Sequence, residues 1–391
     1  MTNNKYIIKS LAPWMIDELL AFSKNNTFDI IFLREQEIFY KDAIEKLKSR
    51  NIKIYVRPYS NKDFFKKIVT VLLFLSSHLF KFKFNYNGVI GLKSIRWFLL
   101  LDTSIFSKSS NIHAQFATQA ALISLLIKEY VNGDPKFSFT FHAHDIYFKN
   151  SWFSLLVNKS HKSFSISDYN IKYVNKHYLF SDKIALARLG VFRKNIKKKE
   201  LTNKSNPSIF TLGLMSRFVE KKGISYLMKA MLRLENEGYH FIKLILAGDG
   251  PLNDEIQDFI EINNLSETIK CLGRVKGDEK ENFYNSIDAF ILPSISIKND
   301  QDGIPVVLME AVAYGLPLIS TNVSGIPEIC INEYNGFLIE EKSVEAIFES
   351  IIKLNENTLK RKKFSENSIL MSDNYDIQLN SKKKLLELEW E

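Results

Sequence analysis

The second half of the chain alternates short apolar runs with longer segments in which apolar residues recur every three or four positions. Helices are predicted between the runs, the last being the apolar stretch GIPVVLMEAVAYG at 303–315. Short buried strands separated by helices of ten or more residues are typical of a parallel, doubly wound sheet. The predicted strands are residues 208–217, 240–248, 268–273, 288–294 and 316–321.

The first half shows the same alternation less clearly. The sequence therefore predicts an α/β protein made of two Rossmann-like domains that face each other across a cleft. Ligands of such sheets bind beyond the carboxyl ends of the strands, so candidate residues are sought there. The strands predicted in this half are residues 28–33, 51–56, 110–114, 136–142 and 162–167.

A basic, polar segment separates the two halves. Residues 193–207 read RKNIKKKELTNKSNP and are predicted to form a solvated linker. The expected domains are residues 1–192 and 208–391, and a length of 391 residues suits two domains. The pattern leaves open whether the last helix crosses back to the first domain.

Composition is that of an ordinary globular protein, with 46% hydrophobic and 25% charged residues. The formal net charge of +9 permits an anionic substrate, an anionic membrane surface or nucleic acid, and selects none of them.

Two isolated cysteines, Cys271 and Cys330, argue against a disulfide framework and a zinc site, and they fit a cytoplasmic protein. The N-terminus lacks the apolar run of a signal peptide.

One segment, residues 64–84, is apolar enough to suggest contact with a membrane. Its uncharged core, residues 68–80, is shorter than the ~20 residues that span a bilayer. Two interpretations stay open: a helix lying on an anionic membrane surface, or a buried crossover helix of the first domain. The flanking cations are Lys66, Lys67, Lys81 and Lys83.

Several cations and a glycine follow the predicted strands of the second half. Arg217 and Lys222 could bind a diphosphate, although two solvated surface cations would give the same pattern. Gly248 would let the backbone approach a ligand closely. Arg274 and Val275 stand where they could border a nucleobase, or they form an ordinary loop.

The start of the apolar helix at 303–315 is the strongest local signal. A proline fits the first turn of a helix, where its missing N–H costs nothing. The glycine before it leaves the backbone open, and the first free N–H groups together with the helix dipole would bind an anion. The segment comprises Gly303, Ile304, Pro305, Val306 and Val307.

Two carboxylates belong to the same stretch, Asp302 before the helix and Glu310 within it. Eight helical residues bring the chain back to within roughly 80° of its starting direction, so both could point to one side as hydroxyl acceptors. The alternative is that Asp302 caps the helix and Glu310 lies on its surface.

Histidines end two of the predicted strands in the first half. His142, His144 and Asp145 lie together in FHAHDIY and could act in acid–base chemistry or bind hydroxyl groups. His113 ends another strand and could face the same cleft, although each of these histidines alone could be structural. No further ligand cluster supports a metal site here. The Asp-x-Asp at 300–302 does not leave a strand directly, so it does not predict a metal site either.

Taken together, these motifs resemble glycosyltransferase family 4, the retaining sugar transferases with the two-domain GT-B fold. FTFHAHDIY and ARLGV in the first half are similar to its exopolysaccharide and lipopolysaccharide branch. The matching segments of the second half, in order, are SRFVEKKG (216–223), LAGDGPL (246–252), CLGRV (271–275), DGIPVVLMEA (302–311), STNVSGIPEI (320–329) and NGFLI (335–339).

The resemblance implies transfer of a sugar from a nucleotide diphosphate donor, with UDP-sugars favoured, to a glycan or lipid-linked acceptor. It implies that the second domain binds the donor and the first domain the acceptor, without a metal or other cofactor. Arg217 and Lys222 match the diphosphate binders, Glu310 matches the ribose ligand, and His142 matches the histidine near the reacting sugar. The acceptor side is expected to include His113, His144 and Asp145.

The chain departs from the family pattern in three places. Asp302 stands where relatives have a glutamate that touches the donor sugar, and Gln115 stands where relatives often have a histidine. The N-terminus lacks the glycine-rich acceptor loop. Two alternatives therefore stay open: a non-catalytic protein that binds glycans or nucleotide-sugars, and a sugar-nucleotide epimerase.

Nucleic acid is not expected as a partner, because the runs of basic residues are interpreted as solvated surfaces. The expected location is the cytoplasm or the inner face of the cytoplasmic membrane.

Overall fold

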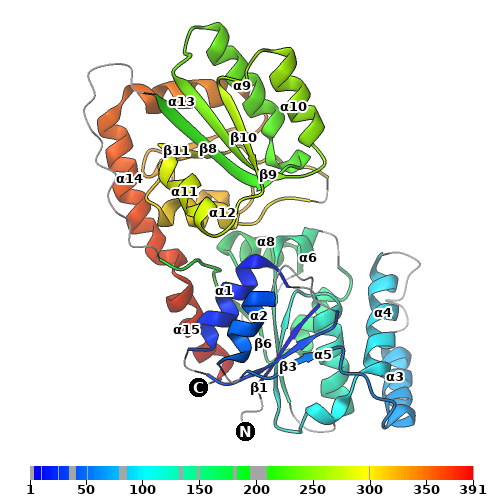
Figure 1. Cartoon of the computed structure of the whole chain (residues 1–391). Helices are drawn as coiled ribbons and strands as arrows, with labels where there is room; N and C mark the ends of the chain where they lie inside the picture. The colour runs from blue at the N-terminus through cyan, green and yellow to red at the C-terminus, as the bar shows by residue number, and fades with distance from the viewer. Residues whose placement is uncertain are drawn as a thin grey trace. The chain divides into compact units, whose positions relative to one another are not determined.

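The computed structural model describes residues 4–9, 11–24, 26–34, 41–50, 52–78, 86–131, 135–147, 150–178, 183–193, 209–298 and 300–390. The chain forms two compact units (Figure 1). Unit 1 comprises Met1–Gly190 with Ile377–Glu391, and unit 2 comprises Val191–Asp376. All of the predicted linker except Arg193 lies outside the described residues, and so do Lys81 and Lys83.

Unit 1 contains a sheet of seven described strands in the order β3-β2-β1-β4-β5-β6-β7, and every neighbouring pair is parallel. The five strands predicted for this half are present, whereas β1 and β7 were not predicted. The strands are β1 (Asn4–Ile8), β2 (Asp29–Phe32), β3 (Ile54–Val56), β4 (Asn111–Gln115), β5 (Lys136–Phe141), β6 (Lys162–Ser165) and β7 (Ile184–Leu186).

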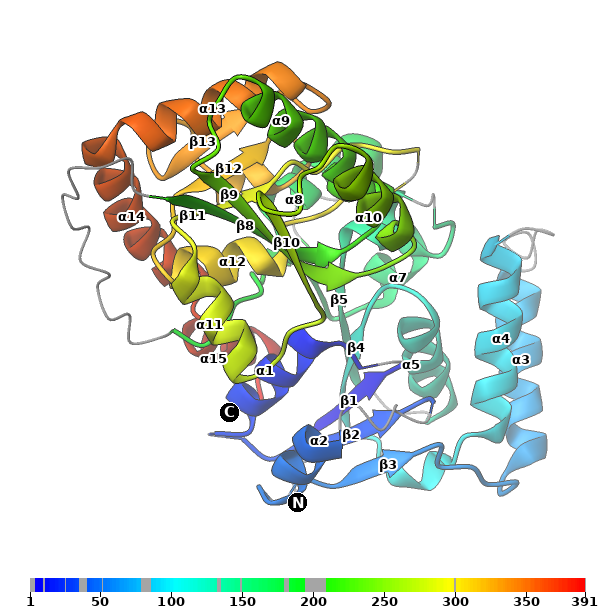
Figure 2. The same ribbon diagram turned by 45° about the horizontal axis from the view of Figure 1, so that its top comes forward.

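Helices cover this sheet, and two of them add a further layer. Every residue of α5 from Gln119 to Ile127 is buried, because α5 lies between the sheet and the pair α3 and α4 (Figure 2). The C-terminal helix α15 packs against α1 in this unit. The helices are α1 (Pro13–Phe22), α2 (Lys41–Lys48), α3 (Phe64–His78), α4 (Tyr86–Leu100), η3 (Thr103–Ile105), α5 (Gln119–Tyr130), α6 (Ala143–Tyr147), α7 (Phe153–Lys159), α8 (Asp168–Tyr178) and α15 (Ile377–Leu388).

Unit 2 contains a parallel sheet of six strands, among the described residues, in the order β10-β9-β8-β11-β12-β13. All five strands predicted for this half are present, and β13 adds an unpredicted edge strand. The predicted α/β fold with two Rossmann-like units is thus confirmed. The strands are β8 (Phe210–Arg217), β9 (Ile242–Asp249), β10 (Ile269–Gly273), β11 (Ala289–Leu292), β12 (Leu318–Thr321) and β13 (Gly336–Ile339).

The helix α12 of unit 2 is apolar because it is buried against α14, β11 and β12. It begins at Val306, so Pro305 is its N-cap rather than its first helical residue. The helices of this unit are η4 (Glu220–Lys222), α9 (Ile224–Asn236), α10 (Asn253–Ile262), α11 (Asp278–Ser286), α12 (Val306–Ala313), η5 (Ile326–Glu328), α13 (Val344–Glu356), α14 (Thr358–Ser372) and η6 (Asp373–Tyr375).

Neither unit contains, in its described part, a helix long and apolar enough to cross a bilayer. The apolar segment predicted at 64–84 forms α3 over 64–78. Its Val71 and Phe74 are buried in the core of unit 1, whereas Phe65, Leu72 and Leu73 are exposed, so the helix is buried on one side only.

Candidate functional site

The sheet of unit 2 reverses its strand order between β8 and β11. In open α/β sheets, ligands bind beyond the carboxyl ends of the strands at such a reversal. The segments that leave these two strands carry Arg217 at the end of β8, Lys222 in η4 and Ser294 just after β11. Sequence reasoning had pointed to the two cations but not to the serine.

A glycine holds the Lys222 turn against the end of β11. Gly223 has a φ of +65°, and a Cβ atom on it would lie 1.9 Å from the carbonyl oxygen of Pro293. The amide of Ile295 also donates a hydrogen bond of 2.9 Å to the carbonyl of Lys221. Any side chain at position 223 would therefore push the lysine turn away from β11.

Asp302 gathers these segments into one cluster. Lys222 Nζ lies 2.6 Å from its Oδ2, and the Ser294 hydroxyl donates to the same oxygen at 2.9 Å. Lys221 Nζ lies 3.6 Å from Oδ1. Burial alone would raise the pKa of the Asp302 carboxyl, but Lys222 and Lys221 outweigh it and hold the pKa below its usual value. Asp302 is therefore a buried, ionised acceptor.

The neighbouring acid of the Asp-x-Asp stretch has its own cation. Asp300 Oδ1 accepts from Lys221 Nζ at 2.9 Å, so the two acids face two successive lysines. Among the described residues, no group of three or more His, Cys, Asp or Glu side chains is placed to hold a metal ion.

The start of α12 has no side-chain cap among the described residues. Its N-cap, Pro305, is extended, with φ −63° and ψ 130°. Asp302 is thus not the helix cap that one interpretation of the sequence allowed. The N–H groups of Val306 and Val307, in the first turn, have no acceptor within the helix. Gly303 precedes them, while the side chain of Ile304 is buried.

Glu310 lies in a second, separate cluster. Its Oε1 accepts from Lys280 Nζ at 2.7 Å, and its Oε2 accepts from the Tyr284 hydroxyl at 2.7 Å. Both partners lie one turn apart on α11, and the Tyr284 ring stacks on Tyr314 at 4.8 Å between centroids. The premise that one helix carries both acids is wrong, because α12 starts only at Val306 and Asp302 precedes it. That the two carboxylates serve one ligand stays a prediction.

Arg217 is an exposed cation at the end of β8. Within the described part of the chain its guanidinium has no hydrogen-bond or ion-pair partner, which leaves it available to a ligand. Beside it in the sequence, the Ser216 hydroxyl is shielded from solvent and has no hydrogen-bond partner among the described residues.

The turn after β9 packs against the end of β8. Gly248 has a φ of +147°, and a Cβ atom there would lie 1.8 Å from the carbonyl oxygen of Ser216. The packing of this turn against β8 therefore requires glycine at position 248, independently of any approach of the backbone to a ligand. Arg274 Nε donates to Asp249 Oδ2 at 2.9 Å from the exposed end of β10, and Val275 beside it is half-buried.

In unit 1, His142 ends a chain of buried hydrogen bonds that starts on the C-terminal helix. Lys384 on α15 donates to Glu18 Oε1 at 2.6 Å, and the Tyr6 hydroxyl lies 2.7 Å from both Glu18 Oε2 and Gln115 Oε1. The Gln115 amide then donates to His142 Nε2 at 2.9 Å. The sequence offered one hint of this network, a glutamate within the apolar helix α1.

Two aromatic rings flank His142. Its ring centroid lies 4.9 Å from that of Trp14 and 4.5 Å from that of Phe116. Phe116 has a φ of +73°, an uncommon conformation for a bulky residue and one often found at functional sites. Burial, and then the charge of Lys384, lower the pKa of His142 to about 3. The imidazole is therefore neutral at physiological pH, accepts through Nε2 and carries its proton on Nδ1.

His113 is a core residue rather than a residue of the acceptor side. Its side chain is fully buried, with Nδ1 2.9 Å from the Ser138 hydroxyl and Nε2 3.0 Å from the Thr140 hydroxyl. Both ring nitrogens are thus occupied by strand β5, so this sequence prediction is corrected by the hydrogen bonding.

Asp145 and His144 differ in burial although they are adjacent on α6. Asp145 Oδ2 accepts from the backbone N–H of His142 at 2.8 Å, while its buried Oδ1 has no partner among the described residues. Burial raises the pKa of the Asp145 carboxyl to about 7, although the backbone N–H groups of His142 and Ala117 act to lower it. His144 is exposed. The structure thus brings His142 and Asp145 together and leaves His144 on the surface.

Comparison with known proteins places the chain in a family. A model of the family "Glycosyl transferases group 1" matches residues 192–371. The uncharacterized glycosyltransferase MJ1178 of Methanocaldococcus jannaschii is 30% identical over 263 residues, covering 66% of this chain and 68% of that protein. The chain belongs to the group 1 glycosyl transferases. The amylovoran biosynthesis glycosyltransferase AmsK of Erwinia amylovora is 30% identical over 177 residues, or 45% of this chain.

Among solved structures, two match nearly the whole length of the chain. Alr3699/HepE of Anabaena, in complex with UDP, has a TM-score of 0.72 at 15% identity and covers 100% of both chains. A glycosyltransferase of Rickettsia africae ESF-5 has a TM-score of 0.69 at 18% identity, covering 99% and 98%. These likenesses establish the GT-B fold. The sequence match spans about two fifths of the length of the first curated relatives, 43% for AmsK.

Proposed function

We propose that this chain is a retaining glycosyltransferase that moves a sugar from a nucleotide diphosphate donor to a polysaccharide or a lipid-linked glycan. Membership of the group 1 family supports the reaction class. UDP is the favoured nucleotide, since HepE is described in complex with UDP and glucose, and another structural relative with UDP and GlcNAc. Relatives named for amylovoran and capsular polysaccharide biosynthesis support the acceptor class.

The cluster of Lys222, Asp302 and Ser294 is the observation that carries the proposal. It lies where the segments leaving β8 and β11 meet the chain entering α12, the place where a parallel sheet binds its ligand. Arg217, Lys222 and the open first turn of α12 would bind the diphosphate and stabilise the charge that builds up as it leaves. Such preorganised electrostatic stabilisation is usually the largest catalytic contribution.

The remaining roles follow from the hydrogen-bonding capacity of each group. Asp302, an ionised acceptor, is suited to a hydroxyl of the donor sugar, and Glu310 to the hydroxyls of the ribose. Lys280 and Tyr284 would hold Glu310 in place for that contact. In unit 1, His142 would donate its Nδ1 proton to a sugar hydroxyl. The cations and the helix would compensate the diphosphate charge without a metal ion.

We also propose that the enzyme works in the cytoplasm. Both cysteines are free thiols, Cys330 buried and Cys271 half-buried, as is typical of a reducing compartment.

The test begins with a panel of UDP-, GDP- and ADP-sugars, read as thermal stabilisation of the full chain. The donor so found is then incubated with alkyl glycosides, and released nucleoside diphosphate and glycosylated product are measured. Arg217→Ala combined with Lys222→Ala should abolish transfer, while Lys229→Ala, a surface cation of the same unit, should leave it unchanged. Near wild-type transfer by the double variant would refute the proposed mechanism. Isomerised donor in the absence of acceptor would indicate an epimerase instead.

A further inference from the structure

The helices α3 and α4 bury one side, and no described element covers the other side. Val71 and Phe74 of α3, with Ile90 and Phe98 of α4, join the core around α5. Through these residues both helices bury their apolar inner sides against α5. The outward side of such a helix pair is normally polar, because it faces water.

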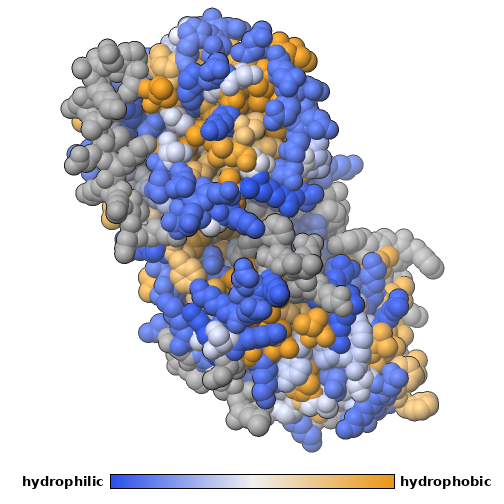
Figure 3. Space-filling view, in the orientation of Figure 1, coloured by the Kyte–Doolittle hydropathy of each residue, from blue (hydrophilic) through white to orange (hydrophobic). Residues whose placement is uncertain are grey.

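Here the outward side is apolar. Phe65 is 85% exposed, Leu73 65% and Leu92 64%. Single apolar residues on a surface are common and need no explanation, but a group of large exposed ones does. Figure 3 shows hydrophobic side chains gathered over these two helices. We call this surface the α3–α4 face, and it consists of Phe64, Phe65, Val69, Leu72, Leu73, Val89 and Leu92.

The charges on the same two helices are almost all positive. Residues 62–96 contain seven Lys or Arg residues and one acidic residue, Asp63, in a chain whose net charge is only +9. One of the seven, Lys67, is buried and donates to the carbonyl of Leu101 at 2.6 Å, so it is structural. The exposed cations of the described part are Lys62, Lys66, Lys93 and Arg96.

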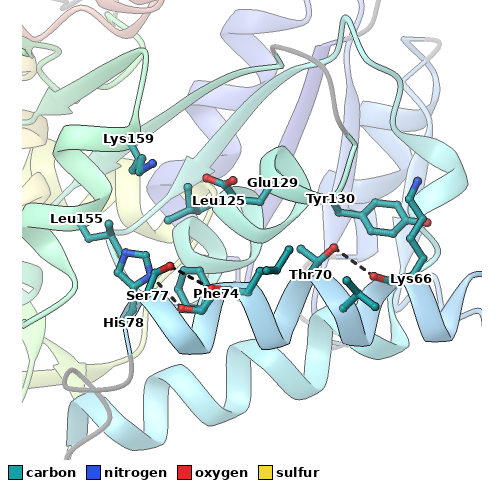
Figure 4. A pocket seen from close by; sticks show the side chains of 12 residues that line it. Lys66, Thr70, Phe74, Ser77, His78, Leu125, Glu129, Tyr130, Leu155 and Lys159 are labelled. Atoms are coloured by element: carbon teal, nitrogen blue, oxygen red, sulfur yellow. Dashed lines mark hydrogen bonds between the residues drawn. The ribbon is translucent and has the colours of Figure 1, made fainter.

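A cavity of about 300 Å³ opens beside this face, between α3, α5 and α7. Val69 and Leu73 contribute to both, so the apolar surface continues into the cavity. Figure 4 shows Lys66 beside Tyr130 at one end and Lys159 at the other, with Glu129 as the one acid of the lining.

We propose that the α3–α4 face docks on a bilayer surface that contains anionic phospholipids. The α3–α4 face combines apolar side chains with cations and has almost no acids, as a surface that binds anionic lipid requires. The apolar side chains would enter the boundary of the acyl chains, and the cations would contact the anionic headgroups. A protein partner would have no need of charges of one sign around this face. The helix α3, with 15 residues, lies in the interface rather than crossing it. The inference rests on the surface of unit 1 alone and is independent of the proposed sugar transfer.

Flotation of the full chain with vesicles tests this. We expect binding to vesicles of phosphatidylcholine with phosphatidylglycerol, and little binding to phosphatidylcholine alone. Phe65→Ser with Leu72→Ser and Leu92→Ser should raise the lipid concentration for half-binding by roughly tenfold or more. The matched control is Ile262→Ser with Leu359→Ser and Leu370→Ser, equally exposed residues of unit 2, which should bind as wild type.

A second test removes the positive charges of this surface. Lys62→Gln with Lys93→Gln and Arg96→Gln should weaken binding to the anionic vesicles and reduce its dependence on salt. Circular dichroism and melting temperature confirm that each variant is folded. Failure of the wild type to float with anionic vesicles, or an equal loss in the control variant, would overturn the proposal. So would a concentration-dependent dimer that the Phe65, Leu72 and Leu92 substitutions abolish, because the face would then join two copies.

Discussion

Two buried aspartates, one in each unit, lie in opposite electrostatic surroundings. Asp302 in unit 2 is 8% exposed and Asp145 in unit 1 is 1% exposed. Asp302 has Lys222, Lys221 and the Ser294 hydroxyl as partners, whereas Asp145 is met by the backbone N–H groups of His142 and Ala117. The Oδ1 atom of Asp145 makes no hydrogen bond in the described part of the chain. The pKa of the Asp302 carboxyl is therefore lowered, and that of Asp145 is raised to about 7.

The comparison shows that burial alone does not decide the charge of a carboxyl group; its partners do. Unit 2 assembles cations around an ionised acid at the ends of β8 and β11, which suits an anionic ligand such as a diphosphate. In unit 1, the neighbours of His142 are neutral: Gln115, Trp14 and Phe116. Such neutral surroundings suit the binding of sugar hydroxyl groups. The predictions below test this division.

The largest effect is expected from removing the cation of the Asp302 cluster. Lys222→Ala should lower kcat/KM by about 10²–10³-fold, since it removes charge stabilisation of the leaving diphosphate. Lys221→Ala should cost far less, because Lys221 lies 3.6 Å from Asp302 and pairs with Asp300 instead. Steady-state kinetics measure both, with the donor that the thermal-stabilisation panel identifies. Equal losses in the two variants would show that the cluster has no special role.

The next effect concerns stability in unit 1, where Lys384 and Glu18 form a buried ion pair. Lys384→Met should lower the free energy of unfolding by about 3–5 kcal/mol, because it leaves the buried Glu18 charge without a cation. Adding Glu18→Leu should restore much of the loss. Urea denaturation of the three chains checks this. A cost below about 1 kcal/mol for the single variant would mean that Glu18 is not a buried charge.

A pH-dependent effect follows from Asp145. A carboxyl group whose pKa rises from 3.8 to about 7 on folding binds its proton more tightly in the folded state. Its contribution is therefore present below about pH 4 and is lost as the pH rises to 7. The loss amounts to at most roughly 4 kcal/mol, from 1.36 kcal/mol per pKa unit.

Asp145→Asn removes this titration, so the variant should gain stability relative to wild type between pH 5 and pH 8. The comparison uses a difference between two chains because His142, with a pKa of about 3, acts in the opposite direction: its contribution is lost as the pH falls below 6.5. Melting temperatures at the two pH values suffice. A difference between the chains that does not change with pH would contradict the raised pKa.

The smallest effect is expected at Glu310. Lys280 is partly exposed, so Lys280→Ala should change the free energy of unfolding by less than about 1 kcal/mol. Tyr284→Phe should cost more, roughly 1.5–3 kcal/mol, because its buried hydroxyl donates to a charged group. Urea denaturation measures both, and the reverse order would show that the lysine, not the tyrosine, holds Glu310.

The sequence predicted five of the six described strands of unit 2 and the helices between them, because short buried strands and apolar helices leave a strong pattern. It did not reveal Ser294, Lys280 or Tyr284, since these act through contacts between elements distant in the chain. The argument that one helix carries Asp302 and Glu310 was wrong, because the helix begins four residues after the aspartate. His113 could not be told from a surface histidine, because the hydroxyls of Ser138 and Thr140 reach it only across the sheet.

Calorimetric titration of the full chain with UDP tests most directly whether unit 2 binds a pyrophosphate through Arg217, Lys222 and the first turn of α12. The account predicts binding at one site by the wild type, weakened by rising salt, and at least about tenfold weaker binding by Arg217→Ala combined with Lys222→Ala. Lys229→Ala should bind as the wild type does. Equal affinity of the wild type and the double variant would contradict the account.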